Sequence, residues 1–200
     1  MPERIVDSIV AMAAAEDQVR AIRALASPRQ GETVSALIDL AQHPLLGGPA
    51  RAAASYALAD SPRELAVDAV RALLHDEDSD VRTAAAYALG ELGDTVDTGA
   101  LVALLRDPER NTFMVAREAI LALGVLRDAE SVSGLAHDRE LSDGLRLEAV
   151  LALGSMLPHP FADEALRHLE VDCDSPHAIR DAAERARETQ RPRCARGGAA

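Results

Sequence analysis

Aromatic residues are scarce in this chain of 200 residues. They make up 2% of it, as two tyrosines and two phenylalanines, and tryptophan is absent. Because β-sheets draw on aromatic and β-branched side chains, an interior built from alanine and leucine favours closely packed helices. Lysine is absent too, so all 21 basic residues are arginines. Chemistry that needs a lysine amine, such as Schiff-base formation, is therefore excluded.

Cysteine and long hydrophobic runs are also lacking. Cys173 and Cys194 are the only cysteines, which excludes a disulfide framework as the basis of the fold. The first residues do not have the basic and apolar segments of a signal peptide, and no apolar run is long enough to span a bilayer. The sequence therefore predicts a cytoplasmic protein with no membrane partner.

The charge is strongly negative, at −12 overall. Four arginines and a single glutamate lie from Arg187 onward, so the body of the chain is more acidic than the whole. Nucleic-acid binding depends on neutralising phosphates with basic side chains, so we expect no nucleic-acid partner. An acidic body instead attracts basic partners.

An alanine-rich helical segment that contains arginine recurs along the chain, ending each time in a leucine of similar context. These leucines are Leu25, Leu58, Leu89, Leu123 and Leu153, at spacings of 33, 31, 34 and 30 residues. Internal repetition with this period is typical of stacked supersecondary units. Such arrays bind along a curved surface and seldom carry chemistry of their own.

Shorter segments with helical apolar periodicity lie between the repeats. They cover residues 4–14, 33–40, 65–74, 99–105, 132–136 and 162–169. Prolines, glycines and aspartates fill the connectors, as expected at helix ends. The sequence therefore predicts twelve helices in six antiparallel pairs. We expect residues 1–190 to form one domain and the arginine-rich residues 191–200 to be a disordered tail.

One stretch carries a family resemblance. Residues 78–94, with the sequence DSDVRTAAAYALGELGD, closely resemble the HEAT-like repeat named after the phycobilin lyases (PBS lyase), and the likeness extends over roughly residues 15–190. The resemblance implies an all-α, right-handed α-solenoid of about six HEAT-like hairpins. It does not imply one activity, because this family includes lyases, hydroxylases, scaffolds and binding proteins.

The resemblance also implies a structural role for the repeated arginine. At this position the arginine acts as a ladder residue that bonds an acid or a carbonyl of a neighbouring loop. The predicted ladder residues are Arg51, Arg82, Arg146 and Arg180. Asp78 and Asp80 are expected to cap the helix that follows them.

In this family the second helix of each pair lines the concave side. The outward positions of these helices predict a partner-binding surface with an apolar centre and an acidic rim. Its predicted members are Tyr56, Asp80, Thr83, Tyr87, Glu91, Phe113, Met114, Arg117, Glu118, Leu121, Leu147, Glu148 and Leu151. Tyr56 and Tyr87 should stand side by side on this wall. The alternative is that these side chains pack between adjacent repeats.

Signals for metal binding or catalysis are weak. His43, His75 and His137 occur at the ends of first helices, where a cation interacts favourably with the helix dipole. Related di-iron hydroxylases use His–Glu pairs, and the sequence contains no such dipeptide. Phosphate-binding loops and nucleophile motifs are absent as well. We therefore expect no metal, no cofactor and no catalytic residue.

The sequence thus predicts a non-catalytic HEAT-repeat scaffold or adaptor whose concave groove binds a protein or peptide with a basic rim. Two alternatives stay open. One is a bilin lyase or a lyase-like tetrapyrrole chaperone, whose ligand would need arginines for its propionates. The other is an acidic, immunity-type protein that neutralises a basic partner.

Overall fold

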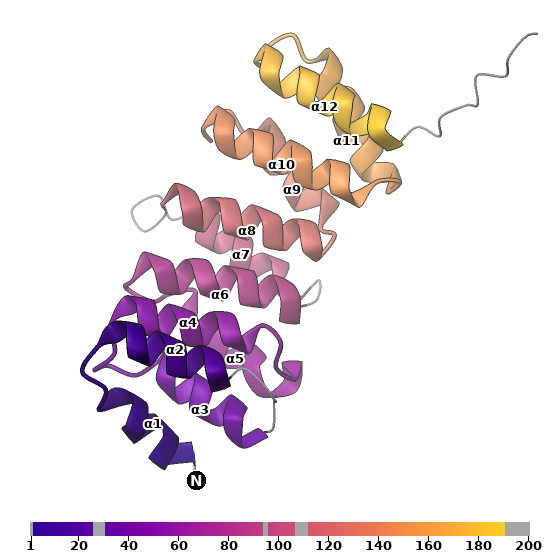
Figure 1. The fold of residues 1–200 in the computed structure, drawn as a ribbon. Helices are drawn as coiled ribbons and strands as arrows, with labels where there is room; N and C mark the ends of the chain where they lie inside the picture. Colours follow the sequence, from indigo (N-terminus) through magenta and orange to yellow (C-terminus); the bar gives the residue numbers. More distant parts are fainter. Residues whose placement is uncertain (1, 26–30, 94–95, 107–111, 191–200) are drawn as a thin grey trace, which may run out of the picture. The chain divides into compact units, whose positions relative to one another are not determined.

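The computed structural model describes residues 2–25, 31–93, 96–106 and 112–190. These ranges contain twelve helices and no strand (Figure 1), which confirms the predicted all-α class. The helices are α1 (Pro2–Val10), α2 (Ala15–Leu25), α3 (Gly31–Ala41), α4 (Gly48–Leu58), α5 (Arg63–Leu73), α6 (Ser79–Leu92), α7 (Thr98–Leu105), α8 (Phe113–Val125), α9 (Ala129–His137), α10 (Asp143–Met156), α11 (Pro160–Val171) and α12 (His177–Gln190).

The helices belong to two compact units, Met1–Leu126 and Arg127–Ala200. In each unit successive helices pair as hairpins, and the hairpins stack through their second helices. In the first unit α2, α4, α6 and α8 lie side by side in one layer, with α5 and α7 behind it (Figure 1). In the second unit α10 packs on α12 in the same way. One domain over residues 1–190 stays a prediction, and the expected tail lies outside the described residues.

The repeated leucines form the core of the stacks. Leu58, Leu89, Leu123 and Leu153 are all fully buried. In the first repeat, however, Ile22 is the fully buried residue and Leu25 is only partly buried. Ile22 therefore supplies the fully buried apolar side chain of α2.

The first helix is shorter than the sequence predicts. It covers Pro2–Val10, whereas periodicity suggested residues 4–14. Proline is favoured at the start of a helix because its fixed φ suits the helix and its missing N–H has no partner there. After Val10 the chain turns, and the Gln18 side chain donates a hydrogen bond to the Met12 carbonyl. None of the described helices is both long enough and apolar enough to cross a bilayer.

Close packing of the second helices depends on small residues. A Cβ atom added to Gly90 on α6 would lie 2.9 Å from both Cα and Cβ of Ala122 on α8. In the second unit, a Cβ on Gly154 of α10 would lie 2.9 Å from Cβ of Ala186 on α12. Alanine and glycine at these positions therefore allow neighbouring helices to approach closely.

A buried carboxylate connects two hairpins of the first unit. The side chain of Asp97 is fully buried, and its carboxylate accepts hydrogen bonds from Arg63 at 2.9 Å and from Nε of Arg71 at 2.6 Å. The hydrogen bond to Asp97 is the main reason that the pKa of Arg71 is raised. A buried charge with two partners holds α5 against the start of α7.

A second charge network lies in the C-terminal unit. Arg187 of α12 donates a hydrogen bond to Asp163 at 2.8 Å and contacts both carboxylate oxygens of Glu170 at 2.6 and 2.7 Å. Arg167 also contacts Asp163, at 2.8 Å. The hydrogen bonds from Arg187 and Arg167 lower the pKa of Asp163 below its ordinary value of 3.8. This network fastens α12 to α11.

The lowered pKa of Asp163 predicts a loss of stability in acid. In the unfolded chain the carboxyl takes up its proton at a higher pH than in the folded protein, so folding is favoured above that pH. The contribution is complete at neutral pH and disappears as the pH falls from about 5 to about 2. We expect Asp163→Asn to be less stable at pH 7 and to lose less stability on acidification. Urea unfolding at a series of pH values measures both effects.

The control for this experiment is Glu164→Gln, which removes one carboxylate from an exposed position of the same helix. Its loss of stability with falling pH should match that of the wild type. Equal pH profiles for the wild type and Asp163→Asn would show that the network does not contribute to stability.

Candidate functional site

Two of the predicted ladder arginines meet at the loop before α6. Arg51 of α4 donates a hydrogen bond to the Asp76 carboxylate at 2.6 Å. Arg82 of α6 is buried and donates to the backbone carbonyls of Asp76 and Glu77 at 2.8 and 2.9 Å. Both guanidinium groups therefore act on the same short loop. They order the loop from which α6 begins.

The ladder continues in the second unit with one exception. Arg146 of α10 is buried and donates to the Ala136 carbonyl at 3.1 Å and to the Ser175 hydroxyl at 2.8 Å. Arg180 is partly buried, and within the described ranges its guanidinium makes no hydrogen bond or ion pair.

Capping residues fix where α6 and α8 begin. The carboxylate of Asp78 accepts a hydrogen bond from the Asp80 N–H at 2.8 Å, which confirms Asp78 as the N-cap of α6. Asp80 itself lies in the first turn of α6, where its charge favours the positive helix end. Thr112 caps α8 by accepting from the Val115 N–H at 3.3 Å. These caps set the register of the side chains discussed next.

Large apolar side chains are exposed on the second helices of the first unit. The exposed fraction is 44% for Tyr56, 39% for Tyr87, 50% for Phe113 and 54% for Met114. Asp80 and Glu91 are also exposed, whereas Arg117, Glu118 and Leu121 are partly buried. We call the surface formed by six of these side chains the tyrosine face. Its members are Tyr56, Asp80, Tyr87, Phe113, Met114 and Glu118.

A cavity of about 270 Å³ lies beside the tyrosine face. Its lining residues come from α2, α4, α6 and α8, which places the predicted residues Tyr56, Asp80, Thr83 and Met114 around one hollow. Thr83 differs from its neighbours because it is buried, and its hydroxyl donates to the Ser79 carbonyl at 2.8 Å. Thr83 thus contributes to the wall of the cavity rather than to an exposed surface.

The two tyrosines are in contact. Their ring centroids lie 5.4 Å apart with the ring planes tilted by 54°, which confirms the expected side-by-side placement. This geometry is typical of favourable aromatic pairs. The pKa of Tyr56 is raised, first by burial and then by the charges of Glu118, Asp80 and Tyr87. Residues of three helices therefore converge on the Tyr56 hydroxyl.

On the tyrosine face, the carboxylate of Glu118 on α8 is the one whose pKa is changed by burial. Burial raises its pKa, and the nearby charge of Arg117 only partly opposes the effect. Among the described residues, none donates a hydrogen bond to this carboxylate or forms an ion pair with it. A partly desolvated anion without a donor is costly, so the site favours the approach of a cation.

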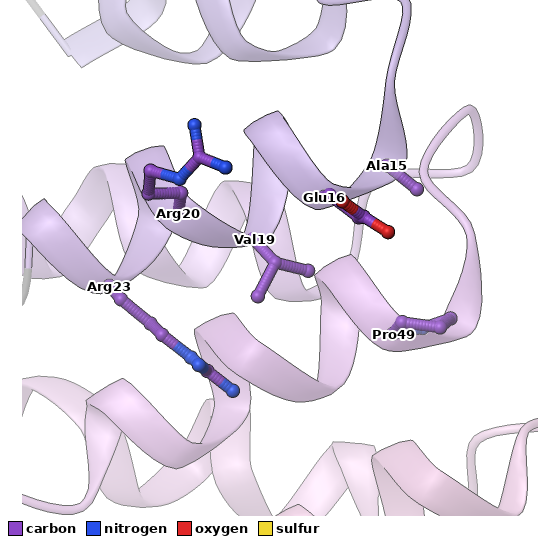
Figure 2. Close-up of a pocket in the computed structure, with 6 residues that line it drawn as sticks. All are labelled: Ala15, Glu16, Val19, Arg20, Arg23 and Pro49. Atoms are coloured by element: carbon purple, nitrogen blue, oxygen red, sulfur yellow. The ribbon is translucent and has the colours of Figure 1, made fainter.

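A larger cavity, of about 500 Å³, opens between α2 and the start of α4 (Figure 2). It is lined by Ala15, Glu16, Val19, Arg20, Arg23 and Pro49. Arg23 and Pro49 also line the smaller cavity, so the two cavities are neighbours. Figure 2 shows Arg23 extending from α2 across toward the next helix, while Arg20 points to the other side. Arg20 contacts Asp17 at 3.0 Å.

Sequence reasoning did not find Arg20 and Arg23 as pocket residues. Their helix departs from the repeat pattern, and Ile22 rather than Leu25 faces the core. Alignment on Leu25 therefore did not show which side of α2 faces the cavity. A search for the most apolar stripe of α2 would have placed Ile22 inside and Arg23 beside α4.

The remaining predicted residues belong to the second unit. On α10, Leu151 is 53% exposed, and Leu147 and Glu148 are partly buried. Their role in binding stays a prediction. Within the described ranges no three histidine, cysteine or acidic side chains gather in a way that suits a metal ion.

Comparisons with known proteins concern the fold. The family described as HEAT repeats matches residues 48–113. Among solved structures, the chain is similar to the complex of CpcE and CpcF of phycocyanin lyase from Nostoc sp. PCC7120, with a TM-score of 0.60 and 21% identity, covering 92% of this chain and 74% of that chain. No curated protein matches the sequence.

Two further structures resemble this chain. Human deoxyhypusine hydroxylase in complex with glycerol gives a TM-score of 0.49 at 17% identity, covering 92% of this chain and 83% of that chain. An engineered protein gives a TM-score of 0.48 at 21% identity, covering 92% of this chain and 56% of that chain. The chain therefore contains HEAT repeats over residues 48–113, and its stacked helical hairpins have a fold like that of the phycocyanin lyase chain.

Proposed function

We propose that the tyrosine face binds a segment of another protein, without catalysis, and that this protein acts as a scaffold or adaptor in the cytoplasm. The observation that carries the proposal is the exposure of aromatic and methionine side chains around a cavity on one layer of helices. Tyrosine, phenylalanine and methionine are enriched at protein interfaces, and a contiguous apolar patch is costly unless a partner covers it.

Charge supports a partner with basic flanking residues. Asp80, Glu91 and Glu118 lie on or next to the face, and the chain carries a net charge of −12. Complementary charge raises the association rate and selects against acidic partners. The proposed ligand is therefore a segment with one or two apolar anchors between basic residues. A basic protein that this chain neutralises would present the same chemistry.

The face can be tested with peptides selected by display on the immobilised full-length chain. We expect the selected peptides to combine basic and apolar residues. The double substitution Tyr56→Ala and Tyr87→Ala should weaken their binding at least tenfold, because central aromatic residues contribute most of an interface's energy. Fluorescence anisotropy with labelled peptides measures the affinities. Circular dichroism should show nearly unchanged helix content and melting temperature, since both rings are exposed.

A matched control is Leu65→Ala on α5, which removes an apolar side chain of similar exposure from a first helix of the unit. This variant should bind the peptides as the wild type does. If the tyrosine double variant retained full affinity, or if Leu65→Ala lost as much, the assignment of the face would be wrong.

A second candidate function has one specific observation in its favour. Arg20 and Arg23 both line the cavity of about 500 Å³ between α2 and α4, and a guanidinium group such as that of Arg23 suits a carboxylate of a tetrapyrrole. The similar fold in the complex named as a phycocyanin lyase is the reason for considering this ligand class. A visible absorbance band after mixing the protein with bilin or haem, lost in Arg23→Gln, would support this candidate over the peptide-binding function.

A further inference from the structure

Three helices bring aromatic rings and carboxylates together at Tyr56. The ring of Tyr87 from α6 lies 5.4 Å away, tilted by 54°, and the charges of Asp80 from α6 and Glu118 from α8 act on the Tyr56 hydroxyl. Both rings keep about two fifths of their surface exposed. Negative charges from α6 and α8 therefore act at one exposed pair of aromatic rings.

The tyrosine rings and the two carboxylates together attract a positively charged group. The face of a tyrosine ring is negative and attracts cations within about 6 Å of the ring centre. Glu118 is partly buried and has no hydrogen-bond donor among the described residues. A cation that reached it would restore the interaction that the carboxylate lost when it left water. An apolar ligand group would leave Glu118 uncompensated.

The space beside the rings suits the end of one side chain. The cavity of about 270 Å³ is bounded by Tyr56, Asp80 and Met114, so a flat group can lie on the ring with apolar contact on one edge. Arg23 lines the same cavity from α2. Asp80 and Glu118, the carboxylates whose charges act on Tyr56, belong to α6 and α8. A cation that pairs with them would therefore approach from these two helices.

Resting on the proposed function, we propose that Tyr56, Tyr87, Asp80 and Glu118 form a subsite for one arginine side chain of the partner segment. The guanidinium lies against the tyrosine rings and donates hydrogen bonds to Glu118. Arginine fits better than lysine because its planar group stacks on aromatic rings, is less strongly hydrated and can present two N–H groups to a carboxylate. Asp80, which lines the same cavity as Tyr56, adds negative charge.

The composition of the chain makes a direct test possible. It has two tyrosines and no tryptophan, so the tyrosine ring signals in a carbon-13 NMR spectrum report on this subsite alone. The probe is Nα-acetyl-arginine methylamide, titrated into the full-length protein. The comparison probe is the citrulline analogue, which has the same shape and no charge. We expect saturable shifts of both rings with arginine and at least about fivefold weaker binding with citrulline.

Two variants make the test specific. Glu118→Gln keeps the size of the side chain and should weaken arginine binding at least about threefold. Glu64→Gln, an exposed position on α5, makes the same change of net charge and should bind as the wild type does. Equal ring shifts with arginine and citrulline, or equal losses in the two variants, would overturn the subsite.

The display-selected peptides separate this inference from the proposed function. Replacing arginine by citrulline in such a peptide can leave its affinity unchanged while the tyrosine double variant still abolishes binding. In that case the tyrosine face binds peptides, as proposed, and the arginine subsite is wrong. If no selected peptide depends on the tyrosines, the proposed function fails. An arginine-dependent shift of the rings would then still establish the subsite.

Discussion

Replacing Leu89 by alanine is expected to lower the free energy of unfolding by about 2–5 kcal/mol. Leu89 is fully buried on α6, whose neighbours are α4, α5 and α8. Truncation removes apolar contacts and leaves a cavity that closely packed helices cannot fill. Urea or thermal unfolding followed by circular dichroism measures the effect, and the variant should melt well below the wild type.

The control is Val125→Ala, which truncates a side chain that is 57% exposed at the end of α8. Its stability should stay within about 0.5 kcal/mol of the wild type. A melting temperature for Leu89→Ala equal to that of the wild type would contradict the position of this leucine in the core.

The second large effect is expected for Gly90→Ala. A methyl group at this position would lie 2.9 Å from Cα and Cβ of Ala122, so α6 and α8 would have to move apart. Overpacking of this kind costs about 1–3 kcal/mol, occasionally more. The better helix propensity of alanine, about 1 kcal/mol, offsets only part of this cost. We expect a net loss of stability and weaker binding at the tyrosine face, because α6 and α8 carry five of its six residues.

Gly134→Ala is the matched control for this substitution. Gly134 lies within α9, and an added Cβ would meet no atom within 4 Å. Without a steric cost, alanine should stabilise the chain by about 0.5–1 kcal/mol through its helix propensity. Opposite signs for the two substitutions are expected in chemical unfolding. Stabilisation by Gly90→Ala as well would show that the helices separate at little cost.

Much of the fold follows from local pattern. Alanine-rich stretches, apolar residues at helical spacing and proline-containing connectors predicted the number, order and pairing of the helices, because helix formation depends mainly on neighbours in sequence. The leucine period identified Leu58, Leu89, Leu123 and Leu153 as core residues, and all four are fully buried. In the first repeat the equivalent Leu25 is partly buried, and Ile22 is the fully buried residue of α2.

The candidate site could be predicted only in part. Helical spacing placed Tyr56 and Tyr87 on the same side of successive second helices, and the contact between their rings confirms that placement. The sequence did not predict that Arg23 lines a cavity, because its position depends on how α2 packs against α4. Nor could the sequence show that Thr83 is buried, because its environment is set by the neighbouring helices.

The sequence by itself determined that this chain is helical, repeated and acidic, because periodicity and charge are properties of the residues alone. Helical spacing also placed Tyr56 and Tyr87 on the same side of two successive repeats. Only the tertiary structure decided which of those side chains meet. The distance between the tyrosine rings, the desolvation of Glu118 and the cavities beside α2 depend on how closely separate helices approach. That approach is set by contacts between residues about thirty positions apart, such as Gly90 and Ala122, which no local pattern encodes.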